Sequence, residues 1–339
     1  MSDLGRPQPA EPAAPTSGHP AGGQPDRARR GQAAPEPYQS NGADPRVVGG
    51  TGSDRGSAGA GPAGAEPGGG GRGRPGRNLP AAFAVGGGLG AAVLVSLLWW
   101  RPAFLALIVA AVCLASWELT RAVRLRGAQP PLLPLLAGGA AMAVSAWFAG
   151  PAGLAIALLV TGLAILVWRL SGGPTGYQRD VGAALLIAMY VPFLAGFAAL
   201  LAAADDGHLR VLMMLILVVL SDTGGYVVGA LVGRRPMAPQ ISPKKSWEGL
   251  AGSLTAAAVG GAVGLPLLLG AAWWAGLLVG LLVCAAAVLG DLVESVLKRD
   301  LGLKDMSGLL PGHGGLMDRL DSILFAAPAA YLLLSVVAS

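Results

Sequence analysis

Residues 181–204 read VGAALLIAMYVPFLAGFAALLAAA, a run of 24 residues without a charged side chain. A helix rises about 1.5 Å per residue, so this run is long enough to cross a hydrocarbon core of about 30 Å. The same chemistry dominates the chain, because 53% of its 339 residues are hydrophobic and only 13% are charged. A soluble domain carries about 25% charged residues. The composition therefore predicts an integral membrane protein.

Nine apolar runs of this kind follow one another from Leu79 to the end of the chain. They cover residues 80–100, 102–120, 131–149, 152–169, 181–204, 209–232, 250–269, 271–290 and 319–338. Each run is expected to be a helix, because a segment in lipid must satisfy its backbone hydrogen bonds internally. Several runs are near the minimum length and are separated by only a Gly, a Pro or an Arg. We predict an all-α polytopic membrane protein with about nine transmembrane helices.

The basic residues gather in the loops after the second, fourth, sixth and eighth runs. They are Arg121, Arg124, Arg126, Arg169, Arg179, Arg234, Arg235, Lys244, Lys245, Lys298, Arg299 and Lys304. The alternate loops offer only Arg101, Gly150, the mixed segment 205–210 and a short segment near Gly270. Cytoplasmic loops are enriched in Lys and Arg. The alternation predicts a multi-pass protein with its N-terminus in the cytoplasm and its C-terminus outside. The Ala, Gly, Arg and Pro bias favours a bacterial cytoplasmic membrane.

Residues 1–78 differ in composition from the rest of the chain. They consist of Gly, Pro, Ala, Ser, Gln and Arg in irregular runs, with almost no large apolar side chains. Such a segment cannot bury enough apolar surface to offset the entropy of ordering it. We therefore predict a disordered cytoplasmic tail over residues 1–78, which is a solvated extension or a docking segment, and a transmembrane domain over residues 79–339.

The remaining compositional features exclude two classes of function. The net charge of +5 does not indicate a nucleic-acid partner, because the basic residues lie in short loops and form no stripe with interleaved aromatic residues. Cys113 and Cys284 lie inside apolar runs without a CxxC spacing. They are interpreted as small core residues rather than as a disulfide or a metal site.

Two polar motifs surround the loop after the sixth run. The first, LSDTGGYVVGALVGRR at 220–235, places Asp222 inside an apolar helix, where a carboxylate is costly and indicates function. The second, APQISPKKSWEGLAGS at 238–253, carries Lys244 and Lys245. These lysines are either phosphate contacts or the positive charges expected of a cytoplasmic loop, and Ser246 is suited to cap the following helix.

A third motif, GDLVESVLKRDLGLKD at 290–305, leaves the eighth run. Asp291, Ser295 and Lys298 recur at i, i+4 and i+7, so a helix presents them on one face with Glu294 beside them. One interpretation is an interfacial helix with surface salt bridges. The other is a site in which a carboxylate, a hydroxyl and an ammonium hold a metal ion and phosphate oxygens.

A fourth motif, LLPGHGGLMDRLDS at 309–322, precedes the ninth run. Gly314 and Gly315 let the backbone approach a ligand closely. Asp318 and Asp321 lie at i and i+3 on one helical face, and either could be only a helix cap. Facing Asp291, they would form an oxygen-rich site for a hard cation such as Mg²⁺, whereas a lone His313 argues against zinc.

The four motifs together resemble those of a known family. Residues 295–322 match the pattern S-x-x-K-R, K-D, P-G-H-G-G and D-R-x-D of the phosphatidate cytidylyltransferases, also called CDP-diacylglycerol synthases. The segments SDTGGYVVGALVG and ISPKKSWEG resemble the other two motifs of that family in the same order. The resemblance covers residues 80–339. Met317 stands where Leu is commoner and Ser246 where Thr is commoner, and neither change removes a charge.

The resemblance implies a reaction and a set of site residues. The family transfers a cytidylyl group from CTP to phosphatidate with Mg²⁺, which is described as paired with K⁺, and the family is described as dimeric. By resemblance, Asp291 and Asp318 hold the metal centre with Ser295 near it, and Asp321 is a weaker metal candidate.

Chemistry assigns the remaining candidate residues. The catalytic set is Asp291, Asp318, Lys298 and Arg299. The candidate substrate contacts are Asp222, Lys244, Lys245, Ser295, Lys304, His313, Gly314, Gly315 and Arg319. The cations among them would screen the developing pyrophosphate, while His313 either donates to a phosphate or orders the glycine-rich turn.

Two other functions fit the sequence less well. A cation-coupled transporter could use Asp222, but it predicts interrupted helices in two corresponding halves, and the polar residues here lie in one half. A CDP-alcohol phosphatidyltransferase would need a D-G-x-x-A-R motif, which the chain does not contain.

Overall fold

The computed structural model describes residues 79–309 and 314–337, with side chains from Gly86 onward. The predicted disordered tail, residues 1–78, lies outside this part of the chain, and so does His313.

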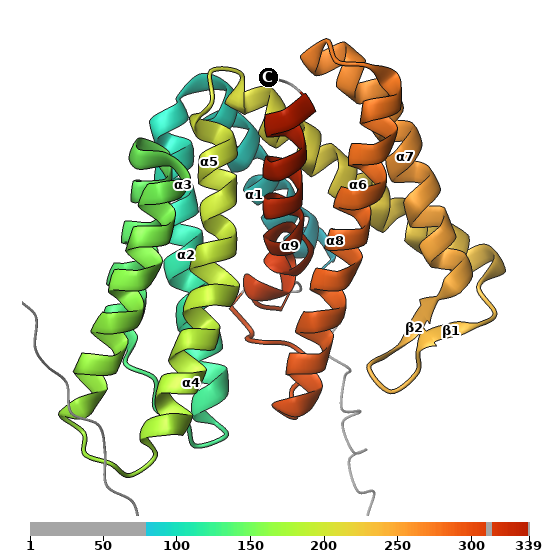
Figure 1. The fold of residues 1–339 in the computed structure, drawn as a ribbon. Helices are drawn as coiled ribbons and strands as arrows, with labels where there is room; N and C mark the ends of the chain where they lie inside the picture. Colours follow the sequence, from blue (N-terminus) through green and yellow to red (C-terminus); the bar gives the residue numbers. More distant parts are fainter. Residues whose placement is uncertain (1–78, 310–313, 338–339) are drawn as a thin grey trace, which may run out of the picture. The chain divides into compact units, whose positions relative to one another are not determined.

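Helices make up most of the described chain (Figure 1). The elements are α1 (Leu79–Trp99), α2 (Arg101–Arg124), α3 (Leu132–Leu170), α4 (Tyr177–Ala188), the π-helix η1 (Met189–Phe193), α5 (Leu194–Ala203), α6 (Gly207–Val232), β1 (Pro236–Ala238), β2 (Ser242–Ser246), α7 (Trp247–Leu269), α8 (Trp273–Asp300) and α9 (Met317–Val337). The two strands form an antiparallel hairpin that pairs Pro236 with Ser246 and Ala238 with Ser242.

Seven helices in the described chain are long and apolar enough to cross a membrane. They are α2, α3, the continuous helix 177–203, α6, α7, α8 and α9. This finding confirms the predicted all-α polytopic membrane protein. The apolar stretch described for α1, Gly86–Trp99, is shorter, so the count of nine spans stays a prediction.

Helix α3 folds back on itself near its middle. Gly150 has φ 67° and ψ −157°, which are not helical values, and Pro151 follows it. A Cβ placed on Gly138 would overlap the side chain of Thr161, so residues about equally far before and after Gly150 are neighbours. The two antiparallel arms correspond to the separately predicted runs 131–149 and 152–169. Glycine is needed at the reversal because other residues rarely adopt a positive φ.

The helix 177–203 contains a π-turn that the sequence pattern did not predict. It spans Met189–Phe193 and includes Pro192. Proline removes a backbone N–H donor and crowds the preceding turn, and a wider turn accommodates both effects. Tyr190 lies in this turn, and its side chain is buried.

Small residues let α6, α7 and α8 approach one another closely. A Cβ on Gly261 of α7 would overlap the backbone of Gly276 in α8. Ser253 of α7 donates a hydrogen bond of 2.7 Å to the carbonyl oxygen of Ser221 in α6. Close backbone contact of this kind replaces the hydrophobic effect as the force that joins helices in lipid. Cys284, which lies 3.2 Å from the Ser221 hydroxyl, is a free core residue as predicted.

The four basic loops lie toward one end of the helices, in the lower part of Figure 1, and hydrogen bonds link neighbouring loops in turn. Asp180 accepts a hydrogen bond of 2.7 Å from the backbone N–H of Gln129, so the loops after α2 and α3 are joined. Arg126 donates to the carbonyl oxygen of Leu301 after α8, at 3.2 Å. Arg299 donates to Ile241 of the β-hairpin, also at 3.2 Å. The loops predicted to be basic therefore lie at the same end of the helical domain.

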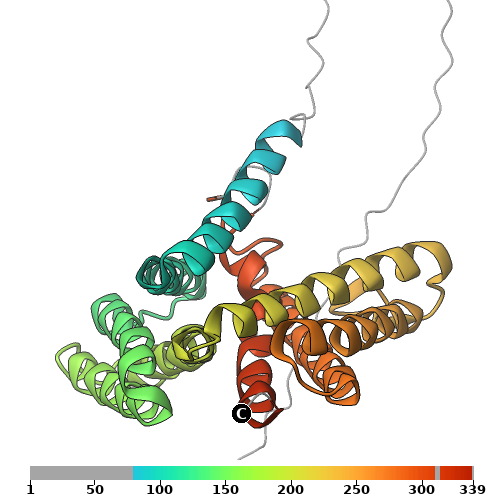
Figure 2. The same ribbon diagram turned by 90° about the horizontal axis from the view of Figure 1, so that it is seen from above.

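Figure 2, seen from above, shows α9 between the helices of the first half and the helices α7 and α8, while α6 runs across from one side to the other. Contacts of α9 with α8, α5 and α6 support this position. The beginning of α9 carries Asp318 and Asp321, so residues from both halves of the chain surround these two carboxylates.

Candidate active site

The polar stripe predicted on α8 is present. Ser295 lies one turn after Asp291, and its hydroxyl is 3.5 Å from Asp291 Oδ1. Lys298, on the next turn, extends toward α9. The three side chains of the stripe are partly buried, and Lys298 reaches another helix, which argues against a purely interfacial helix.

Lys298 joins α8 to α9 through two carboxylates. Its Nζ lies 3.0 Å from Asp318 Oδ1 and forms an ion pair with Glu294. The side chain of Glu294 is 0% exposed, that of Asp318 is 9% exposed and that of Lys298 is 17% exposed. Such burial removes the water that would screen the charges, so the three side chains depend on one another.

Asp318 also organises the loop before α9. It accepts hydrogen bonds from the backbone N–H groups of Gly315, at 2.7 Å, and of Met306, at 3.1 Å. Gly314 has φ +79°, and a Cβ on Gly315 would lie only 2.9 Å from a Glu118 oxygen and 3.1 Å from Asp318 Oδ2. Both predicted glycines are thus required by the backbone and by close packing.

A second group of carboxylates lies beside Lys298. Oxygens of Asp291, Glu294 and Asp321 are within 4.8 Å of one another. The family resemblance predicted Asp291 and Asp318 as the metal ligands and Asp321 as a weaker candidate. In the structure Asp321 is the one that lies with Asp291, while Asp318 contacts Lys298. The role of Asp318 as a metal ligand stays a prediction.

The cluster formed by Asp291, Glu294 and Asp321 is suited to bind a hard divalent cation. All its donors are oxygens, which Mg²⁺ prefers. Apart from the ion pair with Lys298, neither oxygen of buried Glu294 has a hydrogen-bond partner among the described residues. The ion pairs given by the described residues join Asp291 to Lys245 and join Glu294 and Asp318 to Lys298, so four carboxylates, Asp321 included, lie with two ammonium groups.

Tyr190 is a buried residue that was not found from the sequence. Its ring packs edge-on against Phe325 of α9, with centroids 6.0 Å apart. Its hydroxyl is buried without a partner among the described residues, and the nearby charges that act on it are Glu294, Asp321 and Asp291. No periodic pattern marks a single tyrosine in an apolar run, so only packing identifies it.

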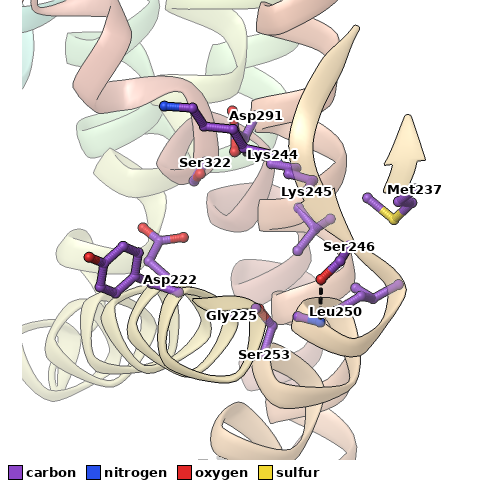
Figure 3. Close-up of a pocket in the computed structure, with 14 residues that line it drawn as sticks. Asp222, Gly225, Met237, Lys244, Lys245, Ser246, Leu250, Ser253, Asp291 and Ser322 are labelled. Carbon is purple, nitrogen blue, oxygen red and sulfur yellow. Dashed lines mark hydrogen bonds and ion pairs between the residues drawn. The ribbon is translucent and has the colours of Figure 1, made fainter. Parts of the chain in front are cut away.

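A cavity of about 310 Å³ adjoins the carboxylates (Figure 3). It is lined by Asp222, Gly225, Tyr226, Gly229, Met237, Lys244, Lys245, Ser246, Gly249, Leu250, Ser253, Val288, Asp291 and Ser322. Lys245 forms an ion pair with Asp291 and thereby connects the β-hairpin to α8. The predicted contacts Asp222, Lys244 and Lys245 are therefore brought together with Asp291.

The wall of the cavity depends on a helix cap. Ser246 accepts a hydrogen bond of 3.0 Å from the backbone N–H of Gly249, which confirms its predicted position at the start of α7 (Figure 3). Glu248 accepts from the backbone N–H groups of Arg234 and Arg235, at 3.1 and 3.2 Å. The two contacts fix the hairpin that carries both lysines.

Three predicted cations are not among the residues that line the cavity. Arg299, Lys304 and Arg319 are exposed. Their proposed contacts with phosphate groups stay predictions, as does any role of His313, which lies outside the described residues.

Glu118 of α2 is a further site residue that sequence reasoning missed. It is fully buried and accepts hydrogen bonds from Ser307, Leu316 and Met317 in and after the loop that precedes α9. A single carboxylate inside the apolar run 102–120 is the signal that could have found it, because such a residue is costly in a membrane helix.

Comparison with known proteins agrees with this geometry. A model of the cytidylyltransferase family matches residues 81–337. Phosphatidate cytidylyltransferases of Mycobacterium bovis and Mycobacterium leprae are each 41% identical over 276 residues, which is 77% of this chain and 89% and 88% of theirs. The phosphatidate cytidylyltransferase of Helicobacter pylori is 40% identical over 159 residues, covering 47% of this chain and 59% of its own. The chain belongs to the cytidylyltransferase family.

Proposed function

We propose that this protein transfers a cytidylyl group from CTP to phosphatidic acid, giving CDP-diacylglycerol and pyrophosphate for phospholipid biosynthesis. The observation that carries the proposal is the ion pair between Lys245 and Asp291, which joins a lysine-lined cavity to a group of three carboxylates. The relatives named as phosphatidate cytidylyltransferases support the choice of substrates.

The reaction requires no strong general base from the protein. A phosphatidate oxygen forms a bond to the α-phosphorus of CTP, the bond from that phosphorus to the oxygen bridging to the β-phosphate breaks, and pyrophosphate leaves. The attacking oxygen is already anionic near pH 7, because a phosphate monoester has a second pKa of about 6. The principal barrier is the repulsion between this anion and the triphosphate.

The cofactor proposed is Mg²⁺, with K⁺ beside it by family resemblance. Asp291, Glu294 and Asp321 would hold the divalent ion, and Asp318 is the further candidate ligand next to them. When bound, Mg²⁺ would neutralise charge on the reacting phosphates. The acidic residues would thus provide the oxygen ligands: Glu294 is 0% exposed, whereas Asp291 is 33% exposed and opens onto the cavity.

The cations are assigned to the phosphate groups. Lys244 and Lys245 line the cavity and are proposed to contact the triphosphate. The exposed residues Arg299, Lys304 and Arg319 are proposed to screen the departing pyrophosphate, and Lys298 fixes Asp318 and Glu294. Positioning and charge neutralisation of this kind supply most of the catalysis in phosphoryl-type transfers.

The proposed topology gives each substrate its own route. The end that carries the basic loops faces the cytoplasm of a bacterium, with the N-terminus inside and the C-terminus outside the cytoplasmic membrane. CTP then arrives from the cytosol, whereas phosphatidic acid arrives within the bilayer. A homodimer is proposed by family resemblance, and no nucleic-acid partner is expected.

The test is a direct assay in proteoliposomes. Wild-type protein given labelled CTP, phosphatidic acid and Mg²⁺ should form CDP-lipid, and EDTA should abolish the activity until Mg²⁺ is restored. Asp318→Asn should lower the rate by about a hundredfold, since one charge-stabilising group is typically worth that much. Asp206→Asn is the control, because Asp206 pairs with Arg210 at the other end of the domain. Absence of CDP-lipid, or a fully active Asp318→Asn variant, would contradict the proposal.

A further inference from the structure

Glu118 connects the first half of the chain to the site formed by the second half. It lies near the end of α2, and its side chain is fully buried. One oxygen accepts hydrogen bonds from Ser307 Oγ at 2.5 Å and from the backbone N–H of Leu316 at 3.0 Å, and the other accepts from the backbone N–H of Met317 at 2.8 Å. A buried carboxylate requires such donors, because it has lost its hydration.

Two of these donors belong to the start of α9, which begins at Met317. The first N–H groups of a helix have no partner within the helix, and the N-terminal end carries a partial positive charge. Glu118 therefore acts as the N-terminal cap of α9 although it is 199 residues away in sequence from Met317. The cap fixes both the axial position and the rotation of the first turn of α9.

The same segment is held from its other side by Asp318. The backbone N–H of Gly315 donates to Asp318 Oδ2 at 2.7 Å, and a Cβ on Gly315 would lie 2.9 Å from Glu118 Oε2. Gly315 is thus enclosed by two carboxylates, one from α2 and one from α9. A shift of the Glu118 side chain would move the backbone that determines where Asp318 and Asp321 point.

We propose that Glu118 is a positioning residue for the transfer reaction: it fixes the start of α9 so that Asp318 stays on Lys298 and Asp321 stays beside Asp291. The kinetic part of this inference rests on the proposed function. Geometric errors of about 1 Å at reacting groups can cost about a hundredfold in rate, so a loosened α9 start should lower kcat.

The experiment compares full-length wild type, Glu118→Gln and Thr120→Val in proteoliposomes. Gln keeps the shape but loses the charge and turns one acceptor into a donor. Thr120 is the matched control, since it is equally buried on α2 and its hydroxyl has no partner among the described residues. Hydrogen exchange is measured without substrate, and kcat and KM are measured with CTP and phosphatidic acid.

Glu118→Gln should speed amide exchange in the peptide covering residues 314–320 by about tenfold while leaving the other helices unchanged. It should lower kcat about 10- to 100-fold and change KM for CTP by less than about threefold, because Glu118 orders the site without touching substrate. Thr120→Val should change neither readout by more than about twofold.

Three outcomes would overturn the inference. Glu118→Gln could leave exchange and kcat unchanged, or it could raise exchange equally in all helices, which would show general destabilisation instead. If Glu118→Gln does not insert into the membrane, Ser307→Ala removes one donor to the same carboxylate, and normal exchange and kcat in that variant would refute the positioning role. If the wild type makes no CDP-lipid, the proposed function fails, while the exchange readout still tests the cap.

Discussion

Replacing Lys298 tests whether the buried charges between α8 and α9 form one interdependent unit. Lys298→Met keeps most of the apolar stem of the side chain and removes the ammonium. That ammonium pairs with Glu294, whose side chain is 0% exposed, and with Asp318, whose side chain is 9% exposed. The single substitution therefore leaves at least one buried carboxylate without a counter-charge.

The expected cost can be estimated from the burial of the partners. Removing one member of a buried ion pair destabilises a protein by about 3–5 kcal/mol, chiefly because the remaining charge is uncompensated. Glu294→Gln removes that charge, and Asp318 keeps its two backbone N–H donors from Gly315 and Met306. The double variant Lys298→Met/Glu294→Gln should thus be more stable than Lys298→Met, with a coupling energy of about 1–3 kcal/mol.

The assay is equilibrium unfolding of the purified protein in detergent micelles, carried out for wild type, both single variants and the double variant. Lys244→Met is the control, since Lys244 is exposed and should change stability by no more than about 0.5 kcal/mol. Effects of the two single substitutions that add to within about 0.5 kcal/mol would refute the interdependence. The double variant should remain catalytically impaired, because stability is regained without the charges of the site.

Three further predictions follow from other contacts. Lys245→Met breaks the ion pair with Asp291, and because the two side chains are 25% and 33% exposed, stability should change by no more than about 1 kcal/mol. In steady-state assays the KM for CTP should rise about tenfold. An unchanged KM would argue against the cavity as the triphosphate site. Tyr190→Phe removes the buried hydroxyl that experiences the charges of the carboxylates, and it should weaken Mg²⁺ binding at least about tenfold. The measurement is the Mg²⁺ dependence of the unfolding temperature. The same dependence in wild type and variant would show that Tyr190 does not affect metal binding. Gly261→Val forces apart the backbones of α7 and α8 and should lower stability by about 3 kcal/mol or prevent insertion into the membrane. Gly182→Ala is the control, since nothing lies within 4 Å of a Cβ at that position. A normal unfolding midpoint for Gly261→Val would contradict the close contact.

Local patterns in the sequence were sufficient to predict the fold class and the polar residues that α8 contributes to the site. Apolar runs of spanning length determine helices in lipid regardless of their neighbours, because the backbone has no other way to satisfy its hydrogen bonds. The stripe of Asp291, Ser295 and Lys298 followed from the helical repeat alone. The basic loops likewise predicted which ends of the helices lie together, as their mutual hydrogen bonds confirm.

The partners of each charged group depended on how the helices pack, which no local pattern encodes. Asp318 and Asp321 share one helical face and the family resemblance favoured Asp318 as the metal ligand, yet Asp318 contacts Lys298 whereas Asp321 lies beside Asp291 and Glu294. Glu118 and Tyr190 are isolated in sequence, and only the tertiary fold brings them to the site. The sequence by itself determined which residues can carry charge in this membrane protein. The tertiary structure decided which charges meet, because pairing requires side chains from distant helices to lie within a few ångströms of each other.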